Sequence, residues 1–327
     1  MIVPMPVPQP CDDLTSVDAV VIGRNEGARL LDCLRSLQGQ VRRVVYVDSG
    51  SVDGSVQAAT DLGAEIVELD MSRPFTAARA RNAGLSRLSG DGFVQLIDGD
   101  CVLQPGWIAA GMAAMAANPG AVVVCGRRRE RCPEASLWNR LCDEEWNTPV
   151  GQTTACGGDA LMRLPALRAV GGFREDLIAG EEPELCLRLR REGGEIWRID
   201  AEMTVHDAAM TRFGQWWQRS RRAGHAFAEG AALHGAGPER HWVGETRRAL
   251  FWGLAVPLAA AGCGLVHPVG WAVLLLWPAQ VARLTLRWRD PAKALFSVVG
   301  KIAEAQGVLG YWGGKLRRKR PALIEYK

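Results

Sequence analysis

Short apolar runs alternate with amphipathic segments in the first hundred residues. The apolar runs have the length and composition of strands that are buried on both faces, and they lie at 19–23, 41–47, 65–69 and 92–97. Segments with apolar positions at helical spacing separate them, at 30–37, 55–62 and 79–88. Strands that alternate with helices in this way predict a parallel, doubly wound sheet.

Polar clusters follow three of these predicted strands. Arg24-Asn25-Glu26 follows the first strand, Asp48-Ser49-Gly50 the second, and Asp98-Gly99-Asp100 the fourth. In an open α/β sheet, ligands bind beyond the carboxyl ends of the strands. The sequence therefore predicts a binding site at this edge of the sheet.

The chain changes character along its length. Residues 121–125, 195–199 and 203–205 predict a mixed extension of the sheet, around a short charged helix. Beyond about residue 215, long apolar helical segments replace the strand pattern. We therefore predict a loose N-terminal tail at 1–15, an α/β domain at 16–215 and a C-terminal helical region at 216–327.

An apolar hairpin at 249–282 dominates the last third. It contains 18 residues without a charge, the break His267-Pro268, and 14 more uncharged residues. As helices these segments measure roughly 27 and 21 Å, against a hydrocarbon core of ~30 Å, so the first barely spans a bilayer and the second falls short. Eight of the twelve tryptophans lie between Trp216 and Trp312, as in an interfacial belt.

The charge distribution supports a membrane role for this hairpin. From Arg283 to the end there are 11 basic and 3 acidic residues, a net charge of +8. We expect the hairpin to dip into the cytoplasmic leaflet while the basic tail contacts anionic lipid. The alternative is a buried helical hairpin in a soluble domain, which leaves the flanking tryptophans and arginines unexplained.

Composition excludes several other classes. With 327 residues, 48% apolar and 23% charged, the chain can bury a full core, which excludes disorder and small disulfide scaffolds. A net charge of only +3 gives no overall attraction to nucleic acid. The nine cysteines show neither zinc-ribbon nor thioredoxin spacing, which favours a reduced cytosolic compartment. The first ten residues carry no positive charge, so we do not expect them to act as a signal peptide.

Carboxylates are the main candidates for chemistry. Asp98 and Asp100, one residue apart at a strand end, can share Mg²⁺ or Mn²⁺ with substrate phosphates, although Asp-Gly-Asp is also an ordinary turn. Asp48 can accept a hydrogen bond from a base or a ribose, and its structural alternative is a helix cap. Three carboxylates in the first turn of one helix, at 181, 182 and 184, either complement the helix dipole or supply a general base.

Taken together, these motifs resemble the family 2 glycosyltransferases with the GT-A fold. The resemblance covers about residues 18–207 and rests on five motifs in the expected order. They are a strand followed by RNEG, a strand followed by DSGSVDGS, RARNAGL, a strand followed by DGD, and the segment from GGDALMRL to EEPELCLRLRREGGEIWRID. The resemblance implies a mixed sheet with helices on both faces and a membrane-associated bacterial enzyme.

The resemblance also implies a role for each matching residue. Four would line the nucleotide pocket, namely Ile22, Arg24, Asn25 and Glu26. Asp48 would contact the base, commonly uracil. Arg79, Arg81 and Asn82 would lie beside the nucleotide, and Asp98 would approach the ribose. Asp100 would hold the metal on the diphosphate, with His206 as a further ligand. Glu182 stands where the family usually has the aspartate base, which leaves Glu181 as the alternative.

The implied activity is inverting, metal-dependent hexosyl transfer with Mn²⁺ or Mg²⁺. The sugar would pass from a nucleotide-sugar, with UDP as the expected nucleotide, to a saccharide or polyprenyl-linked acceptor in envelope or exopolysaccharide biosynthesis, at the cytoplasmic face of the bacterial inner membrane. One alternative, a sugar-nucleotide nucleotidyltransferase, normally carries a glycine-rich loop with a lysine near the first strand, whereas the first lysine here is Lys293. The other alternative is a non-catalytic, membrane-anchored sugar-nucleotide binder.

Overall fold

The computed structural model describes residues 16–317 and groups them into two compact units. The first unit runs to Arg131 and includes 146–173 and 185–207, whereas the second contains 132–145, 174–184 and the chain from 208 onward. The predicted tail at 1–15 and the last part of the basic tail, from Arg318 onward, lie outside the described residues. The predicted boundary at residue 215 stays a prediction.

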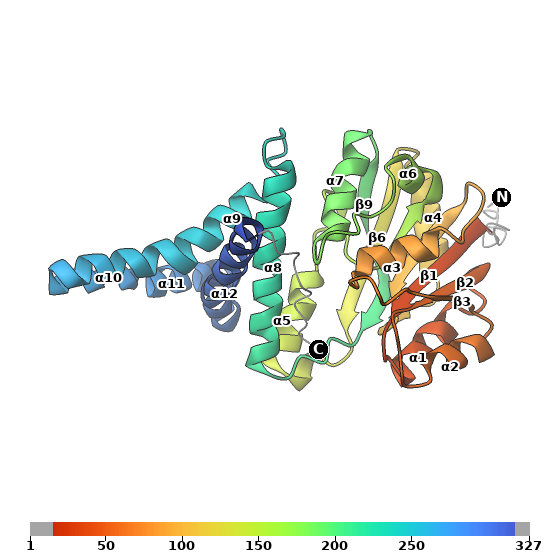
Figure 1. Ribbon diagram of the computed structural model, residues 1–327, viewed down its shortest axis with the longest axis horizontal. Helices are drawn as coiled ribbons and strands as arrows, with labels where there is room; N and C mark the ends of the chain where they lie inside the picture. Colours follow the sequence, from red (N-terminus) through yellow and green to blue (C-terminus); the bar gives the residue numbers. More distant parts are fainter. Residues whose placement is uncertain (1–15, 318–327) are drawn as a thin grey trace, which may run out of the picture. The chain divides into compact units, whose positions relative to one another are not determined.

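The first unit is built on a mixed sheet with nine strands within the described residues (Figure 1). The strand order is β3-β2-β1-β4-β8-β6-β9-β5, and β7 pairs with β9. The bounds are β1 (Val17–Gly23), β2 (Arg43–Asp48), β3 (Glu65–Glu68), β4 (Phe93–Asp98), β5 (Cys101–Leu103), β6 (Ala121–Glu130), β7 (Gly151–Thr153), β8 (Ala160–Arg163) and β9 (Glu195–His206). The first four strands run parallel, as the alternating pattern predicts, and β8 is antiparallel to β4.

Helices on both sides of the sheet complete the fold of the first unit (Figure 1). They are α1 (Ala28–Leu37), α2 (Ser55–Asp61), α3 (Ala77–Leu85), α4 (Trp107–Ala117) and α6 (Leu164–Ala169), with α7 (Glu181–Arg191) shared between the units. α3 packs closely on β1 and β2. A Cβ at Gly84 would lie 2.4 Å from Cγ1 of Val20, so only glycine fits at this contact.

Strand register brings the predicted site residues to one edge. Gly23 of β1 lies opposite Asp48 of β2, and Ile22 lies opposite Asp98 of β4. β1 is buried at six of its seven residues and β4 at its four central ones, which fixes this register. The three polar clusters therefore start side by side.

The sequence pattern predicted two separate strands at 195–199 and 203–205. In the structure these residues form one continuous strand, β9.

The second unit is helical. It contains α5 (Leu137–Trp146, up to Glu145), α8 (Phe213–His234), α9 (Val243–Leu250), the π-helical turn η3 (Phe251–Ala255), α10 (Val256–Val266), the 3₁₀ segment η4 (Pro268–Leu275), α11 (Leu276–Trp288) and α12 (Pro291–Leu316). Glycines allow α8 and α12 to touch backbone to backbone, since a Cβ at Gly224 would lie 2.0 Å from the carbonyl oxygen of Glu304. Around α5, an aromatic cluster joins Trp138, Trp216 and Phe296.

The apolar hairpin is longer than its sequence suggested. Residues 243–266 form one helical run of 24 residues, and residues 268–288 form a run of 21 that begins as a 3₁₀ helix. By length and composition, both runs could cross a membrane. The expectation that the first segment barely spans a bilayer and the second falls short counted only the uncharged stretches. The helices continue past the charged residues that end these stretches, Arg248 at one end and Arg283 at the other.

Candidate active site

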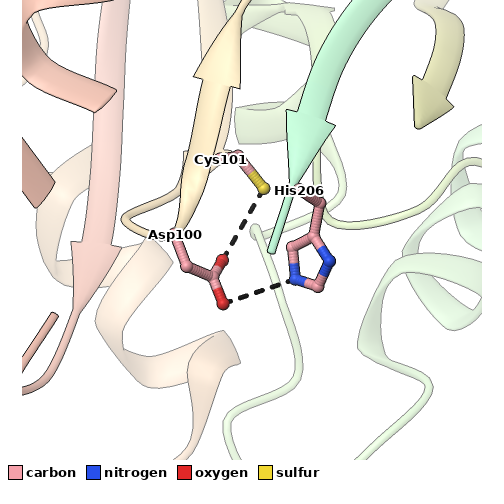
Figure 2. Close-up of side chains that lie close together, drawn as sticks. All are labelled: Asp100, Cys101 and His206. Carbon is pink, nitrogen blue, oxygen red and sulfur yellow. Dashed lines mark hydrogen bonds and ion pairs between the residues drawn. The ribbon is translucent and has the colours of Figure 1, made fainter. Parts of the chain in front are cut away.

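Asp100 and His206 meet at the carboxyl edge of the sheet. Asp100 lies in the turn between β4 and β5, and β5 pairs with β9 so that Cys101 stands opposite His206. Nε2 of His206 is 3.3 Å from Oδ2 of Asp100, and both residues are buried (Figure 2). The two predicted metal ligands, 106 residues apart in the chain, are thus brought together by strand pairing.

The histidine ring is held firmly in this position. It lies edge-on to the ring of Trp146, with centroids 4.9 Å apart. Nδ1 is 3.9 Å from Oε2 of Glu130, and among residues 16–317 no group forms a hydrogen bond with it. Neither residue was singled out from the sequence, because Glu130 reaches the histidine through the pairing of β6 with β9 and Trp146 reaches it from the end of α5.

A divalent cation fits this donor set. Two ligands at right angles around an octahedral ion, with bonds of about 2.1 Å, lie roughly 3.0 Å apart, close to the separation of Asp100 and His206. A carboxylate suits Mg²⁺ or Mn²⁺, and an imidazole suits a transition metal, so the pair favours Mn²⁺. Cys101 also lies here, with its Sγ 3.7 Å from Asp100 Oδ1, but burial raises the pKa of its thiol well above the usual range. A cysteine sulfur is also a soft ligand, which hard ions such as Mg²⁺ and Mn²⁺ do not favour.

Asp98 faces arginines instead of the histidine. Arg81 donates to its Oδ1 at 2.9 Å, and Nη2 of Arg128 lies 3.5 Å from its Oδ2. Burial raises the pKa of Asp98, but Arg81 and then Arg128 outweigh this effect and hold the pKa below its usual value. A Cβ at Gly158 would lie 2.8 Å from Arg81 and 2.9 Å from Asp98, so the second glycine of the Gly-Gly-Asp motif makes room for this pair.

Arg128 and Asp159 complete the charged cluster and were missed as site residues. Asp159 is fully buried, where it accepts hydrogen bonds from the backbone of Asp98 and from Thr204. Arg128 lies 3.4 Å from Asp159, and its guanidinium covers the ring of Trp146 at 5.0 Å. Asp159 belongs to the Gly-Gly-Asp motif that supports the family resemblance, so the sequence did contain a signal for it. Arg128 is one of three consecutive arginines, and the sequence does not indicate which of them reaches the site.

The loops after β1 and β2 are joined by hydrogen bonds. The backbone of Asn25 donates to Oγ of Ser51 at 2.8 Å, and its side chain accepts from the backbone of Val52 at 2.8 Å. Asp48 accepts from Tyr46 and from the backbone amides of Gly50 and Ser51. Asn25 and Asp48 therefore shape the predicted nucleotide pocket from within its own loops.

The other predicted pocket residues after β1 differ in exposure. Ile22 is buried, and its carbonyl accepts from the backbone of Gly99 at 2.8 Å, which ties β1 to the Asp-Gly-Asp turn. Arg24 is exposed, whereas Glu26 is half-buried and pairs with Arg29 at 2.7 Å. Of this group, Arg24 is the residue best placed to reach a ligand from solvent.

Two residues of the RARNAGL segment support loops. Arg79 is buried and donates to the backbone carbonyls of Asp70, Arg73 and Pro74. Asn82 exchanges two hydrogen bonds with the backbone of Phe173, at 2.8 and 2.9 Å. Within this segment, Arg81 is the residue that reaches a carboxylate of the predicted site.

The candidate bases lie on the first turn of α7, in the second compact unit. Glu181 is buried, whereas Glu182 is half-buried. The turn begins at Gly180, whose φ of +80° suits glycine, and Glu184 closes it by donating its backbone N–H to the carbonyl of Gly180 at 3.1 Å. Partial exposure favours Glu182 over Glu181 as the group that meets an acceptor.

Known proteins share both sequence and fold with this chain. Residues 18–163 match the glycosyl transferase family 2 profile. The succinoglycan biosynthesis protein ExoA of Rhizobium meliloti is 26% identical over 92% of this chain and 96% of its own length. The pre-mycofactocin glycosyltransferase of Mycobacterium tuberculosis is 27% identical over 67% of this chain, but only 48% of its own length is matched.

Solved structures agree with the sequence relatives. The mannosyltransferase PcManGT from Pyrobaculum calidifontis, solved with GDP-Man and Mn²⁺, gives a TM-score of 0.63 at 24% identity, over 92% of this chain and 90% of that one. S. aureus TarS 1–349 gives a TM-score of 0.51 at 13% identity, over 92% of both chains. The fold is therefore GT-A, as expected. Residues 18–163 therefore form a family 2 glycosyltransferase domain, and the chain is a glycosyltransferase.

Proposed function

We propose that this glycosyltransferase moves a hexosyl group from a nucleotide-sugar to a hydroxyl of a saccharide or polyprenyl-linked acceptor, with inversion, in the assembly of an exopolysaccharide or another envelope glycan. The relation to ExoA, a succinoglycan biosynthesis protein, supports this acceptor class. UDP-sugars are the first donors to test, and GDP-mannose is the second because PcManGT was solved with it.

The observation that carries the proposal is the pairing of Asp100 with His206 at the carboxyl edge of the sheet. A carboxylate and an imidazole at 3.3 Å suit Mn²⁺ or Mg²⁺, and PcManGT, which shares the fold, was solved with Mn²⁺. When bound there, the cation would neutralise charge on the departing nucleoside diphosphate.

Side chains of this protein supply the remaining chemistry. Arg81 and Arg128 balance the charge of Asp98, so a ribose hydroxyl can donate to that carboxylate without a second cation. Asn25 and Asp48 hold the loops that would receive the base. Glu182 takes the proton of the acceptor hydroxyl as that oxygen attacks the anomeric carbon, and Glu181 is the alternative base. One displacement of this kind inverts the anomeric centre and needs no covalent intermediate.

The apolar hairpin would place the enzyme at the cytoplasmic face of the membrane. Leu265 and Val266 are 86% and 88% exposed, and Val269 and Leu275 are exposed by more than half. In water, so many exposed apolar side chains on one hairpin are costly, whereas in lipid they are stabilised. Arg283, Arg287 and Arg289 follow directly and would contact anionic headgroups, which suits an acceptor carried by a lipid.

A thermal-shift panel tests donor and metal together. The full-length protein is melted with UDP-, GDP- and dTDP-sugars, each with and without Mn²⁺. A donor at 100 times its Kd stabilises the native state by about 2.7 kcal/mol, so one sugar nucleotide should raise the melting temperature clearly, and only with Mn²⁺. The matched controls are Asp100→Asn, which should abolish the shift, and Asp91→Asn, an exposed carboxylate that should not change it.

Product analysis separates the alternatives. Transfer of labelled sugar to an acceptor, with release of nucleoside diphosphate, supports the proposal. Release of pyrophosphate from a nucleoside triphosphate and a sugar 1-phosphate would instead identify a nucleotidyltransferase. Binding without turnover or hydrolysis in every acceptor fraction would identify a non-catalytic binder.

A further inference from the structure

Trp242 fills a space between two glycines of the second unit. A Cβ at Gly180, the residue before α7, would lie 2.4 Å from Cη2 of the indole, and a Cβ at Gly230 of α8 would lie 2.5 Å from its Cε3. His241 stacks on the indole with ring centroids 4.4 Å apart, and Phe227 meets it edge-on at 5.4 Å. The indole is therefore fixed against the start of α7.

The backbone at Trp242 is strained. Its φ is +55°, in the left-handed region that bulky residues rarely adopt. Such a conformation costs about 1–3 kcal/mol and persists only where surrounding contacts impose it. Here the two glycines, His241 and Phe227 supply those contacts, which hold the indole in this position.

A second contact reaches the same turn of α7. Nε2 of His234, the last residue of α8, lies 2.9 Å from Oε1 of Glu184. Since a carboxylate only accepts hydrogen bonds, Nε2 is the donor. Glu184 is 1% exposed, and its buried carboxylate would lose a charge-assisted partner without the histidine. Glu181 and Glu182 lie between Gly180, which Trp242 contacts, and Glu184, which His234 contacts.

We propose that His234 and Trp242 are positioning residues for the candidate base. Neither is assigned a contact with substrate. Together they hold the first turn of α7 at both of its ends, and this orientation sets the carboxylate of Glu182 for proton transfer. The inference rests on the proposed function, because it takes Glu182 as the base. It also assigns a role in the reaction to the α8–α9 connection, which lies outside the family 2 domain at 18–163.

The test compares substitutions at His234 in the full-length protein, reconstituted with anionic vesicles and assayed for sugar transfer. His234→Ala should lower kcat at least tenfold and leave the donor KM within about twofold, because the donor is bound by residues of the other unit. His234→Gln should restore most of the loss, since its side-chain amide can donate to Glu184. Glu239→Ala removes an exposed side chain of the same unit, outside the apolar hairpin, and should leave kcat unchanged.

Two substitutions at Trp242 distinguish a loss of positioning from a loss of folding. Trp242→Phe keeps an aromatic ring between the glycines and should reduce kcat less than Trp242→Leu, with melting temperatures recorded for both. Unchanged kcat in His234→Ala and Trp242→Leu would overturn the proposal. So would a failure of His234→Gln to recover kcat while its melting temperature equals that of the wild type.

The same experiment distinguishes this inference from the proposed function. If Glu182→Gln abolishes turnover while His234→Ala and Trp242→Leu do not alter it, the positioning role alone is wrong. If Glu182→Gln transfers sugar at the wild-type rate, the base assignment fails and the positioning role fails with it.

Discussion

Glu229→Gln should stabilise the helical unit at neutral pH. Glu229 lies on α8, is 8% exposed, and has a carboxyl whose pKa is raised from 4.5 to about 7, mainly by burial and also by Asp176. Between these values the folded protein holds a proton that the unfolded chain has released, so native stability falls as the pH rises through this window. This difference in pKa between the unfolded and the folded protein corresponds to roughly 3 kcal/mol. Glutamine keeps the size of the side chain and cannot ionise, so it removes this cost.

The histidine one turn earlier has the opposite effect. Burial, with a contribution from Arg221, lowers the pKa of His225 from 6.5 to about 4, and its Nδ1 is 3.6 Å from Oε2 of Glu229. The unfolded chain binds the extra proton here, so this residue makes stability rise with pH between about 4 and 6.5. In the wild type the two slopes nearly cancel. Glu229→Gln should therefore match the wild type near pH 4.5 and exceed it by roughly 3 kcal/mol at pH 7.5.

Urea unfolding at pH 4.5, 6 and 7.5 measures this difference. Tryptophan fluorescence reports on the helical unit, since Trp138 and Trp216 are packed within it. Glu239→Gln is the matched control, because this exposed glutamate of the same unit should change stability by only tenths of a kcal/mol. A variant no more stable than the wild type at pH 7.5, or a gain that is equal at all three pH values, would refute the reasoning.

Three further predictions concern the active site and the membrane. Asp100→Asn should abolish metal-dependent transfer and leave the fold intact, as measured by turnover and circular dichroism. Turnover near the wild-type rate would show that Asp100 is not part of the metal site. Glu182→Gln should keep donor binding, measured by calorimetry, and lose transfer. If Glu181→Gln alone shows this pattern, the base is Glu181 and not Glu182. Replacing Leu265, Val266 and Val269 with serine should lower co-sedimentation with anionic liposomes more than tenfold, because each apolar side chain contributes about 1.5 kcal/mol or more in lipid. Val52→Ser, at a site 90% exposed on the other unit, should have no effect, and equal sedimentation of both variants would argue against insertion of the hairpin.

The parallel half of the sheet could be predicted because its signals are local. β1 is buried along six of its seven residues, so its sequence is a nearly continuous apolar run that ends at a glycine. β4 is buried at its four central residues and ends at Asp98. Once parallel order is assumed, the carboxyl ends must lie at one edge, and the polar clusters after them become the candidate site. This reasoning needs no knowledge of long-range contacts.

The charged cluster around Asp98 could not be predicted in the same way. Arg128, Glu130 and Asp159 reach the site through the pairing of β6, β8 and β9, and these pairings join segments far apart in the chain. β6 carries register shifts between Cys125 and Arg128, which decide which of its three arginines points to the site. Local periodicity contains no information on such shifts.

The two carboxylates of the Asp-Gly-Asp triplet are similar in sequence but differ in their surroundings. Asp98 is neutralised by Arg81 and Arg128, whereas Asp100 faces the imidazole of His206. Gly99 between them donates to the carbonyl of Ile22, and a Cβ there would lie 3.2 Å from that oxygen, so the turn is held against β1. If both carboxylates had arginine partners, a cation would gain little from binding, and if neither had one, two buried negative charges would repel each other. This division of partners supports the proposed metal site at Asp100 and His206 and the proposed ribose contact at Asp98.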